Sequence, residues 1–228
     1  MHAAPQERYA FKPFLGSSHR WALNQLAALP AAARVLDIGP GSGFTGSALC
    51  ARGLQELYAV EIDDEARKHL AEIYRRVEPD MSAYHGNSFD AVLLLDVLEH
   101  MQDPFSFLAA AVPMLSPGGL LLVSVPNVAH WSVRLPLLLG YFEYRSRGIL
   151  DRTHCQFFTR RRFRRLIEHP ELRLCSLASS ISPAELALPK TLWDNPLFRT
   201  VSRIRMAGAS AWPGLLAYQH LAALRRAS

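Results

Sequence analysis

Carboxylates and glycines gather around short apolar runs in the first half of the chain. Asp37 lies inside one such run, and Gly39, Gly41 and Gly43 follow it closely. Glycines at this spacing let the backbone approach a ligand closely or take positive φ angles. A further acid, Glu61, ends the next apolar run, about twenty residues on. The pattern predicts a ligand site at the first strand-to-helix turn.

The glycine turn fits two classes of ligand. Gly41, Gly43 and Gly46 have the G-x-G-x-x-G spacing of dinucleotide sites, whereas Gly39, Gly41 and Gly43 have the spacing G-x-G-x-G. Asp37 decides between them. Its carboxylate would repel a pyrophosphate at the following helix N-terminus, but it would attract the ammonium and sulfonium groups of S-adenosylmethionine. We therefore favour S-adenosylmethionine, with an NAD-dependent oxidoreductase as the alternative.

An alternation of apolar runs and helical patterns must position these groups. It predicts an α/β protein, with a mostly parallel sheet and helices on both faces. We expect strands at Arg34–Ile38, Leu57–Glu61, Ala91–Asp96, Leu120–Val125, Leu172–Ser180 and Leu215–Ala223, the last two as antiparallel neighbours, and a short third strand after Arg75. We expect helices at Ser18–Leu29, Phe44–Arg52, Asp64–Arg75, Pro104–Leu115 and Thr159–Glu168.

One domain is expected over residues 1–228. It has a helical segment over 1–30, an acceptor-side insert and basic helix over 127–170, and a helical excursion over 183–214.

Asp96 ends a buried strand at the edge where open α/β sheets bind ligands. It would accept hydrogen bonds from a cofactor there, or else cap a helix.

Composition excludes several protein classes. Half of the 228 residues are hydrophobic and a fifth are charged, which excludes disordered and collagen-like chains. No apolar run approaches the ~18 residues of a membrane span, and the charged Glu7 and Arg8 argue against a signal peptide. The scattered cysteines, Cys50, Cys155 and Cys175, are typical of a reducing compartment, so we expect a cytoplasmic protein.

The net charge of +5 is concentrated in one segment. Of the 25 basic residues 22 are arginines, and ten of these lie between Arg134 and Arg173. Thr159–Glu168 reads as a basic helix that could dock an anionic acceptor or lipid surface. A solvated helix face is the alternative. Nucleic acid is disfavoured because no RNA-binding module is evident.

Four motifs resemble those of class I S-adenosylmethionine-dependent methyltransferases. They are VLDIGPGSG (35–43), AVEID (59–63), FDAVLLLDVLEH (89–100) and LSPGGLLLVSVPN (115–127). The resemblance implies a Rossmann-like sheet of seven strands, six parallel and one antiparallel, with S-adenosylmethionine as the cofactor. Two further motifs, PNxxHW (126–131) and ILDRTHxxFFT (149–159), resemble a bacterial subgroup often found beside polysaccharide, glycolipid and natural-product pathways.

The resemblance also implies roles for particular residues in the cofactor site. Asp37 and the Gly39–Gly43 turn would hold the amino-acid end of the cofactor. Glu61 would accept from both ribose hydroxyls, since a carboxylate offers two acceptor oxygens. Asp80 would lie near the adenine amino group, with Met81 stacked near the ring. A plain surface turn is the alternative for Asp80.

The acceptor side is predicted in the poorly periodic segment after residue 126. Methyl transfer to a hydroxyl requires alignment and removal of a proton, and histidine is the usual base near neutral pH. We expect His154 as the base, oriented by Asp151, with His130 as the alternative and Tyr141–Thr159 as a lid. Asp151 and His154 could instead pin the insert. Their spacing with His130 and His100 matches no metal-ligand set, so we expect no metal.

These features predict a methyltransferase acting on a small-molecule or glycosylated metabolite, with oxygen as the expected methyl acceptor. An N- or C-methyltransferase of the same fold is one alternative. A non-catalytic, cofactor-binding partner protein is another. The basic segment adds peripheral contact with an anionic membrane or a lipid-linked substrate as an expected partner.

Overall fold

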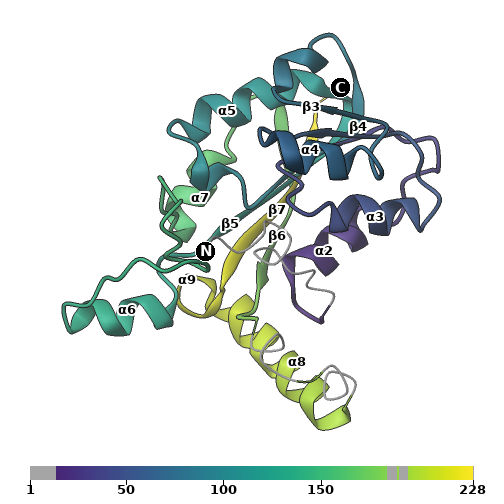
Figure 1. Cartoon of the computed structure of the whole chain (residues 1–228). Helices are drawn as coiled ribbons and strands as arrows, with labels where there is room; N and C mark the ends of the chain where they lie inside the picture. Colours follow the sequence, from purple (N-terminus) through teal and green to yellow (C-terminus); the bar gives the residue numbers. More distant parts are fainter. Residues whose placement is uncertain (1–13, 184–188, 190–194, 228) are drawn as a thin grey trace.

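Short apolar runs form the strands of a seven-stranded sheet within the residues that the structure describes (14–183, 189 and 195–227). The structure is a computed structural model, shown in Figure 1. Its strands are β1 (Val35–Ile38), β2 (Leu57–Val60), β3 (Arg76–Glu78), β4 (Phe89–Leu95), β5 (Leu115–Pro126), β6 (Leu172–Ser180) and β7 (Gln219–Arg226). β1 to β5 pair in parallel, and β7 is antiparallel to β5 and β6, in the order β3-β2-β1-β4-β5-β7-β6. This confirms the expected fold class.

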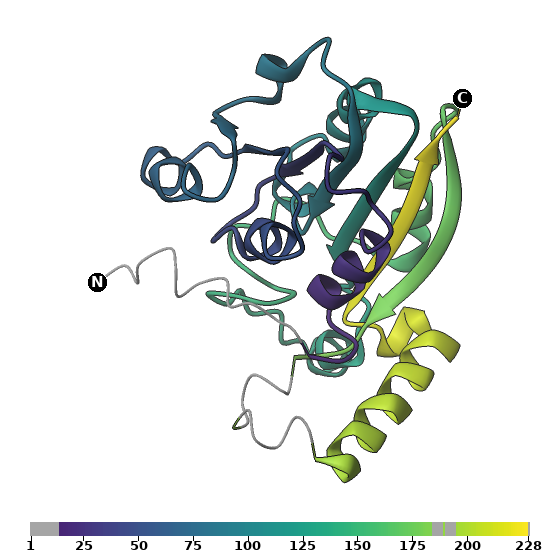
Figure 2. The ribbon, with the colours of Figure 1, turned by 90° about the vertical axis from the view of Figure 1, so that its right-hand side faces the viewer.

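Helices cover both faces of the sheet, because successive side chains of a strand point to opposite faces (Figure 2). Leu36 and Ile38 of β1 pack in the cluster that includes α5 (Pro104–Ala111) and α7 (Arg160–Leu166). Val35 packs in the cluster that includes α2 (Ser18–Gln25), α3 (Phe44–Cys50) and α4 (Asp64–Leu70). The continuous apolar runs in the sequence are therefore strands buried on both faces.

Polar side chains fix where several of these helices begin. Ser17, Asp63, Asp103 and Thr159 each accept a hydrogen bond from a backbone N–H in the first turn of α2, α4, α5 and α7. Such caps satisfy donors that have no partner inside the helix. The basic helix expected over 159–168 is therefore present as α7, with Thr159 as its cap.

Several boundaries differ from the sequence prediction: β4 and β5 begin earlier than expected, α2 and α4 end earlier, and the last strand differs at both ends. The last strand was expected over Leu215–Ala223, but α9 (Pro213–Leu216) occupies its start and β7 continues to Arg226. Proline at the first turn of α9 suits a helix start. The third strand, β3, is as short as expected. Short 3-10 helices complete the connections: η1 (Met81–Tyr84), η2 (Leu98–His100) and η3 (Val112–Met114).

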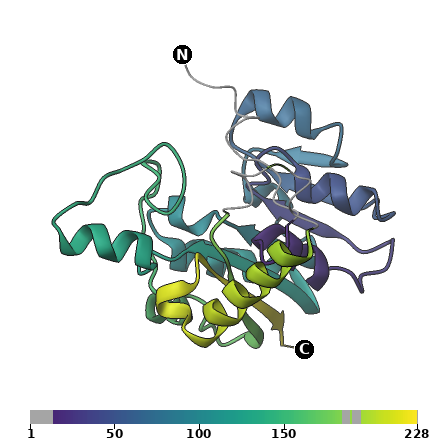
Figure 3. The ribbon, with the colours of Figure 1, turned by 90° about the horizontal axis from the view of Figure 1, so that it is seen from below.

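Two helices project from the sheet at its lower edge in Figure 1, and Figure 3 shows them from below. They are α6 (Trp131–Leu138) and α8 (Pro196–Ala211). α8 supplies the described part of the helical excursion expected over 183–214; residues 184–188 and 190–194 lie outside the described residues, as do 1–13 of the N-terminal segment. Among the described helices, none combines the length and apolarity that crossing a membrane requires.

Asp37 lies in the core rather than at the surface. The residue is 3% exposed, and its Oδ2 accepts a hydrogen bond of 2.7 Å from the Tyr74 hydroxyl. Burial raises the pKa of Asp37 to about 6, against the opposing effect of the Tyr74 hydrogen bond. Tyr74 reaches Asp37 by packing against Gly46 of α3, where a Cβ atom would overlap the tyrosine ring. Gly46 therefore serves this buried pair.

The buried carboxylate gives a prediction about stability. The folded chain retains the Asp37 proton to a higher pH than the unfolded chain, so its unfolding free energy should fall as pH rises from about 4 to about 6. Asp37→Asn removes this decrease in unfolding free energy, because asparagine does not titrate. The variant should gain up to about 3 kcal/mol relative to the wild type between pH 4 and pH 7, which urea unfolding measures. Glu72→Gln, at an exposed acid, is the control. A gain that does not vary with pH would contradict the prediction.

Candidate functional site

One edge of the sheet collects the predicted cofactor groups. Gly39 directly follows β1, Glu61 follows β2, Asp80 lies two residues after β3, and Asp96 follows β4. Because these strands are parallel, their carboxyl ends meet at the same edge. β7 runs the opposite way, so its first residue, Gln219, lies at this edge too. The structure therefore adds a residue that sequence reasoning missed.

In the glycine turn, the three residues with left-handed backbone are the three glycines of the G-x-G-x-G spacing. Gly39, Gly41 and Gly43 have φ angles of 66°, 57° and 72°, in the left-handed region. A Cβ atom on Gly39 would lie 3.0 Å from a methyl group of Val97, which is tighter than ordinary packing. Gly46, by contrast, lies inside α3. The dinucleotide spacing thus includes a glycine whose role is packing against Tyr74.

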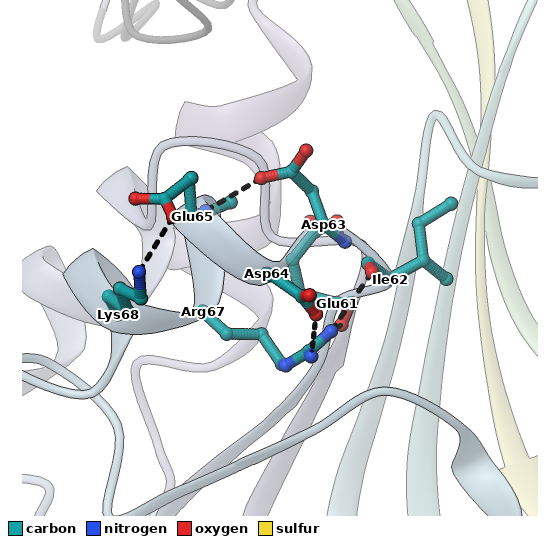
Figure 4. Close-up of polar contacts among 8 residues, drawn as sticks. Glu61, Ile62, Asp63, Asp64, Glu65, Arg67 and Lys68 are labelled. Atoms are coloured by element: carbon teal, nitrogen blue, oxygen red, sulfur yellow. Dashed lines mark hydrogen bonds and ion pairs between the residues drawn. The ribbon is translucent and has the colours of Figure 1, made fainter.

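The loop after β2 presents a half-buried Glu61 beside an exposed apolar side chain (Figure 4). Glu61 Oε1 accepts a 3.0 Å hydrogen bond from the Asp63 N–H. The Arg67 guanidinium donates to the carbonyls of Glu61 and Ile62, at 3.0 and 2.9 Å, and so holds the loop on α4. Ile62 is 83% exposed. Sequence reasoning missed Ile62, although an apolar residue between two acids was the available signal.

Asp80 and Met81 make contacts typical of a turn. Asp80 is exposed, and its Oδ1 accepts a 2.8 Å hydrogen bond from the Ser82 N–H at the start of η1. The hydrogen bonds from Ser82 hold the pKa of Asp80 below its usual value. Met81 is half-buried and packs against the core. Asp80 thus lies in a turn, and this turn is close to Glu61 because the Glu61 N–H donates to the Glu78 carbonyl.

Asp96 is held in an unusual conformation by a polar cluster. It has a φ angle of 57° and is the one non-glycine residue with positive φ among the described residues. The Ser124 hydroxyl donates to its Oδ1 at 2.6 Å, and Gln219 Nε2 donates to Oδ1 and Oδ2 at 2.7 and 2.5 Å. The Ser180 hydroxyl in turn donates to Gln219 Oε1 at 2.7 Å.

These four residues, named the Asp96 cluster here, link β4, β5, β6 and β7. Backbone conformations of this kind cost on the order of 1–3 kcal/mol and tend to occur at functional sites. The side chain of Asp96 caps no helix: the residue that precedes η2 is Val97, which provides no side-chain cap. The helix-cap alternative for Asp96 is therefore wrong.

Backbone hydrogen bonds join two motifs that lie fifty residues apart. The Glu99 carbonyl accepts from the N–H groups of Cys155 and Gln156, at 2.8 and 2.9 Å. His100 Nδ1 lies 3.1 Å from the Thr153 carbonyl oxygen. As a result, the His154 ring lies against the His100 ring, with centroids 4.9 Å apart and planes at 76°. The part of the expected lid after residue 151 is thus fixed against η2.

His154 is oriented by a backbone carbonyl rather than by Asp151. Its Nδ1 lies 3.0 Å from the Ile149 carbonyl oxygen, which can only accept, so Nδ1 carries the proton and Nε2 keeps a lone pair. Asp151 Oδ1 instead accepts from the N–H and hydroxyl of Thr153, at 2.9 and 2.8 Å. The expectation that Asp151 orients His154 is corrected accordingly. Burial, then the neighbouring His100, lowers the pKa of His154.

His130 has a structural position at the start of α6. Its Nδ1 accepts from the Ser132 N–H at 3.3 Å and lies 2.7 Å from the Ser132 hydroxyl. Burial lowers the pKa of His130 to about 4, so the ring is neutral near pH 7 and its proton is on Nε2. Neither nitrogen then offers a free lone pair for a base. His130 is therefore corrected from an alternative base to a helix cap.

Aromatic rings line the acceptor side next to His154. Phe142, Tyr144 and Phe157 have centroids 5.8 to 6.2 Å apart, and the Phe157 ring lies 6.5 Å from that of His154. Residues 141–148 are all exposed. The first half of the expected lid therefore lies at the surface, with an aromatic cluster connecting it to the fixed second half.

The basic helix α7 has two kinds of arginine. Arg162 donates to the Phe157 carbonyl at 3.0 Å and lies over the Phe158 ring at 5.0 Å, so it anchors the acceptor-side segment. The remaining arginines of the helix are exposed: Arg160, Arg161, Arg164 and Arg165. Arg162 is thus part of the fold, and only the other four can form a docking face.

Comparison with known proteins identifies the family. The methyltransferase-domain family profile matches residues 16–177. Curated relatives named ubiquinone biosynthesis O-methyltransferase are 36% identical over 135 residues (Xanthomonas axonopodis pv. citri, 55% of each chain) and 37% identical over 137 residues (Xanthomonas campestris pv. campestris, 56% of each chain). The chain thus matches about half the length of these relatives.

A solved structure agrees in fold. A SAM-dependent methyltransferase from Archaeoglobus fulgidus superposes with a TM-score of 0.59 at 17% identity, over 92% of this chain and 94% of that one. The family match covers most of the described sheet, including the glycine turn, Glu61 and Asp96. The chain belongs to the methyltransferase-domain family and has the class I, Rossmann-like fold of S-adenosylmethionine-dependent methyltransferases.

Proposed function

We propose that this protein transfers a methyl group from S-adenosylmethionine to a hydroxyl oxygen of a small-molecule or glycosylated metabolite. The observation that carries the proposal is the position of His154: its ring lies against His100 of η2, which follows β4, and its Nε2 keeps a lone pair. The relatives are named as O-methyltransferases, which favours oxygen over nitrogen or carbon as the acceptor atom.

The residues of the edge suit this cofactor. The left-handed glycines leave the turn open to a close approach, Glu61 offers carboxylate oxygens for ribose hydroxyls, and the exposed Ile62 offers apolar surface for a purine. Asp37 acts from beneath the turn, through its charge, because its carboxylate is buried against Tyr74. Asp80 and Met81 would border the adenine from the neighbouring turn.

Glu61 provides a direct test of cofactor binding. Glu61→Ala should weaken the affinity for S-adenosylmethionine by roughly 1.5–3 kcal/mol, because a charge-assisted hydrogen bond of that size is lost. Isothermal titration calorimetry measures the change. The matched control is Glu65→Ala, which removes an exposed acid from the same loop-helix segment, where it pairs with Lys68 (Figure 4). Equal affinities for the two variants would contradict the assignment.

The chemistry needs few groups from the protein. S-adenosylmethionine supplies an electrophilic methyl group on a positively charged sulfur. His154 is neutral near pH 7 because its pKa is lowered, so its Nε2 can accept the hydroxyl proton. The carbonyl of Ile149 fixes the ring, which keeps that lone pair in one direction. Phe142, Tyr144 and Phe157 offer an apolar surface that would exclude water from the acceptor.

Removing His154 tests the acceptor half of the proposal. His154→Ala should lower turnover by about 10²–10⁴-fold, the usual contribution of a general base, with cofactor affinity unchanged. Formation of S-adenosylhomocysteine with a panel of phenolic and glycosylated hydroxyl compounds is the measurement, and His85→Ala, at an exposed histidine, is the control. Turnover within about tenfold of wild type would contradict the role.

The panel also separates the alternatives. Product analysis that places the methyl group on nitrogen or carbon would favour an N- or C-methyltransferase. A wild-type chain that binds the cofactor tightly yet converts none of the compounds would favour a non-catalytic partner protein.

The surface next to the acceptor side suits an anionic membrane or a lipid-linked substrate. Leu138 and Leu139 at the end of α6 are 80% and 76% exposed. Exposed aromatic residues (Tyr141, Tyr144) and arginines (Arg134, Arg145) lie in the same segment. Apolar, aromatic and basic side chains on one projecting element are typical of segments that lie in a membrane interface. We infer that the chain works in the cytoplasm at such a surface.

Vesicle binding tests this contact. The wild type should sediment with phosphatidylglycerol vesicles and only weakly with phosphatidylcholine vesicles, because arginines favour anionic lipids. Changing Leu138 and Leu139 together to Ser should weaken binding at least tenfold, since two apolar side chains lose their burial in lipid (about 1.5–3 kcal/mol each when complete). Leu174→Ser, at an exposed position of β6, is the control. Unchanged sedimentation of the double variant would contradict the proposal.

A further inference from the structure

Three side chains that can bind metal ions converge at the acceptor side. Glu99, His100 and His154 each offer one ligand atom, and these atoms lie within 4.8 Å of one another. Glu99 and His100 belong to η2, whereas His154 comes from the segment docked on it. Sequence spacing gave no indication of this group, because an adjacent pair and a distant third residue form no short motif.

The backbone around the three residues is fixed. The Glu99 carbonyl holds the Cys155 and Gln156 N–H groups, and Gln156 Nε2 donates to the Gln102 carbonyl at 2.9 Å. The two segments therefore meet through these three hydrogen bonds and through the contact of His100 Nδ1 with the Thr153 carbonyl. A site assembled on such a framework is preorganised, so an ion need not order the chain when it binds.

Both imidazoles have the same proton arrangement. His100 Nδ1 lies 3.1 Å from the Thr153 carbonyl oxygen and His154 Nδ1 lies 3.0 Å from that of Ile149. Carbonyl oxygens only accept, so each ring carries its proton on Nδ1 and its lone pair on Nε2. Histidines that bind metal usually donate their other ring N–H to a carbonyl or carboxylate in this way.

The third group supplies negative charge. Glu99 is 1% exposed, and the carboxylates of Asp96 and Asp151 also act electrostatically on His154. Ligand atoms about 2.1 Å from a common ion lie about 3.0–3.4 Å apart, so small side-chain rotations from the present spacing complete the geometry. The oxygens of Asp96 already accept from Ser124 and Gln219, which leaves Asp96 outside the ligand set.

We propose that Glu99, His100 and His154 bind a divalent transition-metal ion, and that this ion binds the acceptor oxygen. Two imidazoles and one carboxylate suit Zn²⁺ or Fe²⁺ better than Mg²⁺ or Ca²⁺, which prefer oxygen ligands. Three protein ligands also leave coordination positions for an exogenous oxygen.

This inference rests on the proposed function for the identity of the bound oxygen. A hydroxyl on a divalent ion loses its proton more readily than one in water. In the ion-bound chain the proton goes to water, the oxygen lone pair forms the new O–CH₃ bond, and the S–CH₃ bond breaks with its electron pair returning to sulfur. His154 then acts as a ligand; in the ion-free chain the same lone pair accepts the proton.

Cobalt titration of the full chain tests the site. After treatment with EDTA and its removal, Co²⁺ should bind at one ion per chain and develop visible absorption different from that of aqueous Co²⁺. Zn²⁺ should displace it in calorimetry. His100→Ala, His154→Ala and Glu99→Gln should each weaken Co²⁺ affinity at least tenfold, because loss of a ligand should cost no less than loss of an outer-shell partner. His85→Ala should match the wild type.

Circular dichroism and S-adenosylmethionine titration show whether each variant remains folded. If one variant unfolds, the wild-type cobalt spectrum and the Co²⁺ affinities of the remaining variants test the metal site. A wild-type spectrum equal to that of aqueous Co²⁺ overturns the proposal, as does equal affinity in the wild type and the folded ligand variants. Ion binding is measured without any methyl acceptor, so its failure is distinguishable from failure of the proposed methyl transfer.

Discussion

The acceptor side of this protein depends on the hydrogen bonds between Asp96 and Gln219. They connect the end of a central parallel strand to the beginning of the antiparallel one. With Ser124 on the strand between them, they hold Asp96 at a positive φ angle that an aspartate would otherwise leave. The direction in which the chain leaves β4 follows from this, and it determines where η2 begins.

After η2, backbone hydrogen bonds determine where the acceptor-side residues lie. The carbonyl of Glu99 accepts hydrogen bonds from the segment that carries His154. The carbonyls of Thr153 and Ile149 determine the tautomers of His100 and His154. Main-chain carbonyls are well suited to this task because they are fixed by the fold and do not titrate.

The cofactor side is organised differently. There a buried carboxylate under a glycine turn gives the edge a negative potential, which matches a cationic ligand better than a phosphate.

Local sequence patterns were sufficient for most strands of the sheet and for the glycine turn after β1. Strands buried on both faces appear as apolar runs, and a turn with three left-handed residues requires glycines, so β1, β4 and the turn could be predicted. Glu61 followed from its distance to that turn. The start of β7 was predicted wrongly because a short apolar run fits a helix or a strand equally well until proline chemistry decides.

The acceptor side could not be predicted to the same depth. The hydrogen-bond partners of Asp96 lie 28 and 123 residues away in the sequence. The partner of His154 is a backbone carbonyl, which every residue has, and the partner of Asp151 is a threonine two residues on. Nothing in the sequence distinguishes these partners from other polar groups. Hydrogen bonds of this kind depend on how segments pack, which composition and spacing do not encode. His130 illustrates the same limit. A histidine that precedes a helix gives the same sequence pattern whether it caps the helix or faces a substrate.

The contact between Gly46 and Tyr74 has a consequence for how such a sequence can change. The tyrosine ring occupies the space in which any other residue at position 46 would place its Cβ atom. A larger residue at position 46 therefore requires a smaller one at position 74, and that second change removes the hydroxyl donor from Asp37. Position 46 in α3 and position 74 in the turn after α4 thus constrain each other, and a change at this pair alters the surroundings of Asp37 in β1.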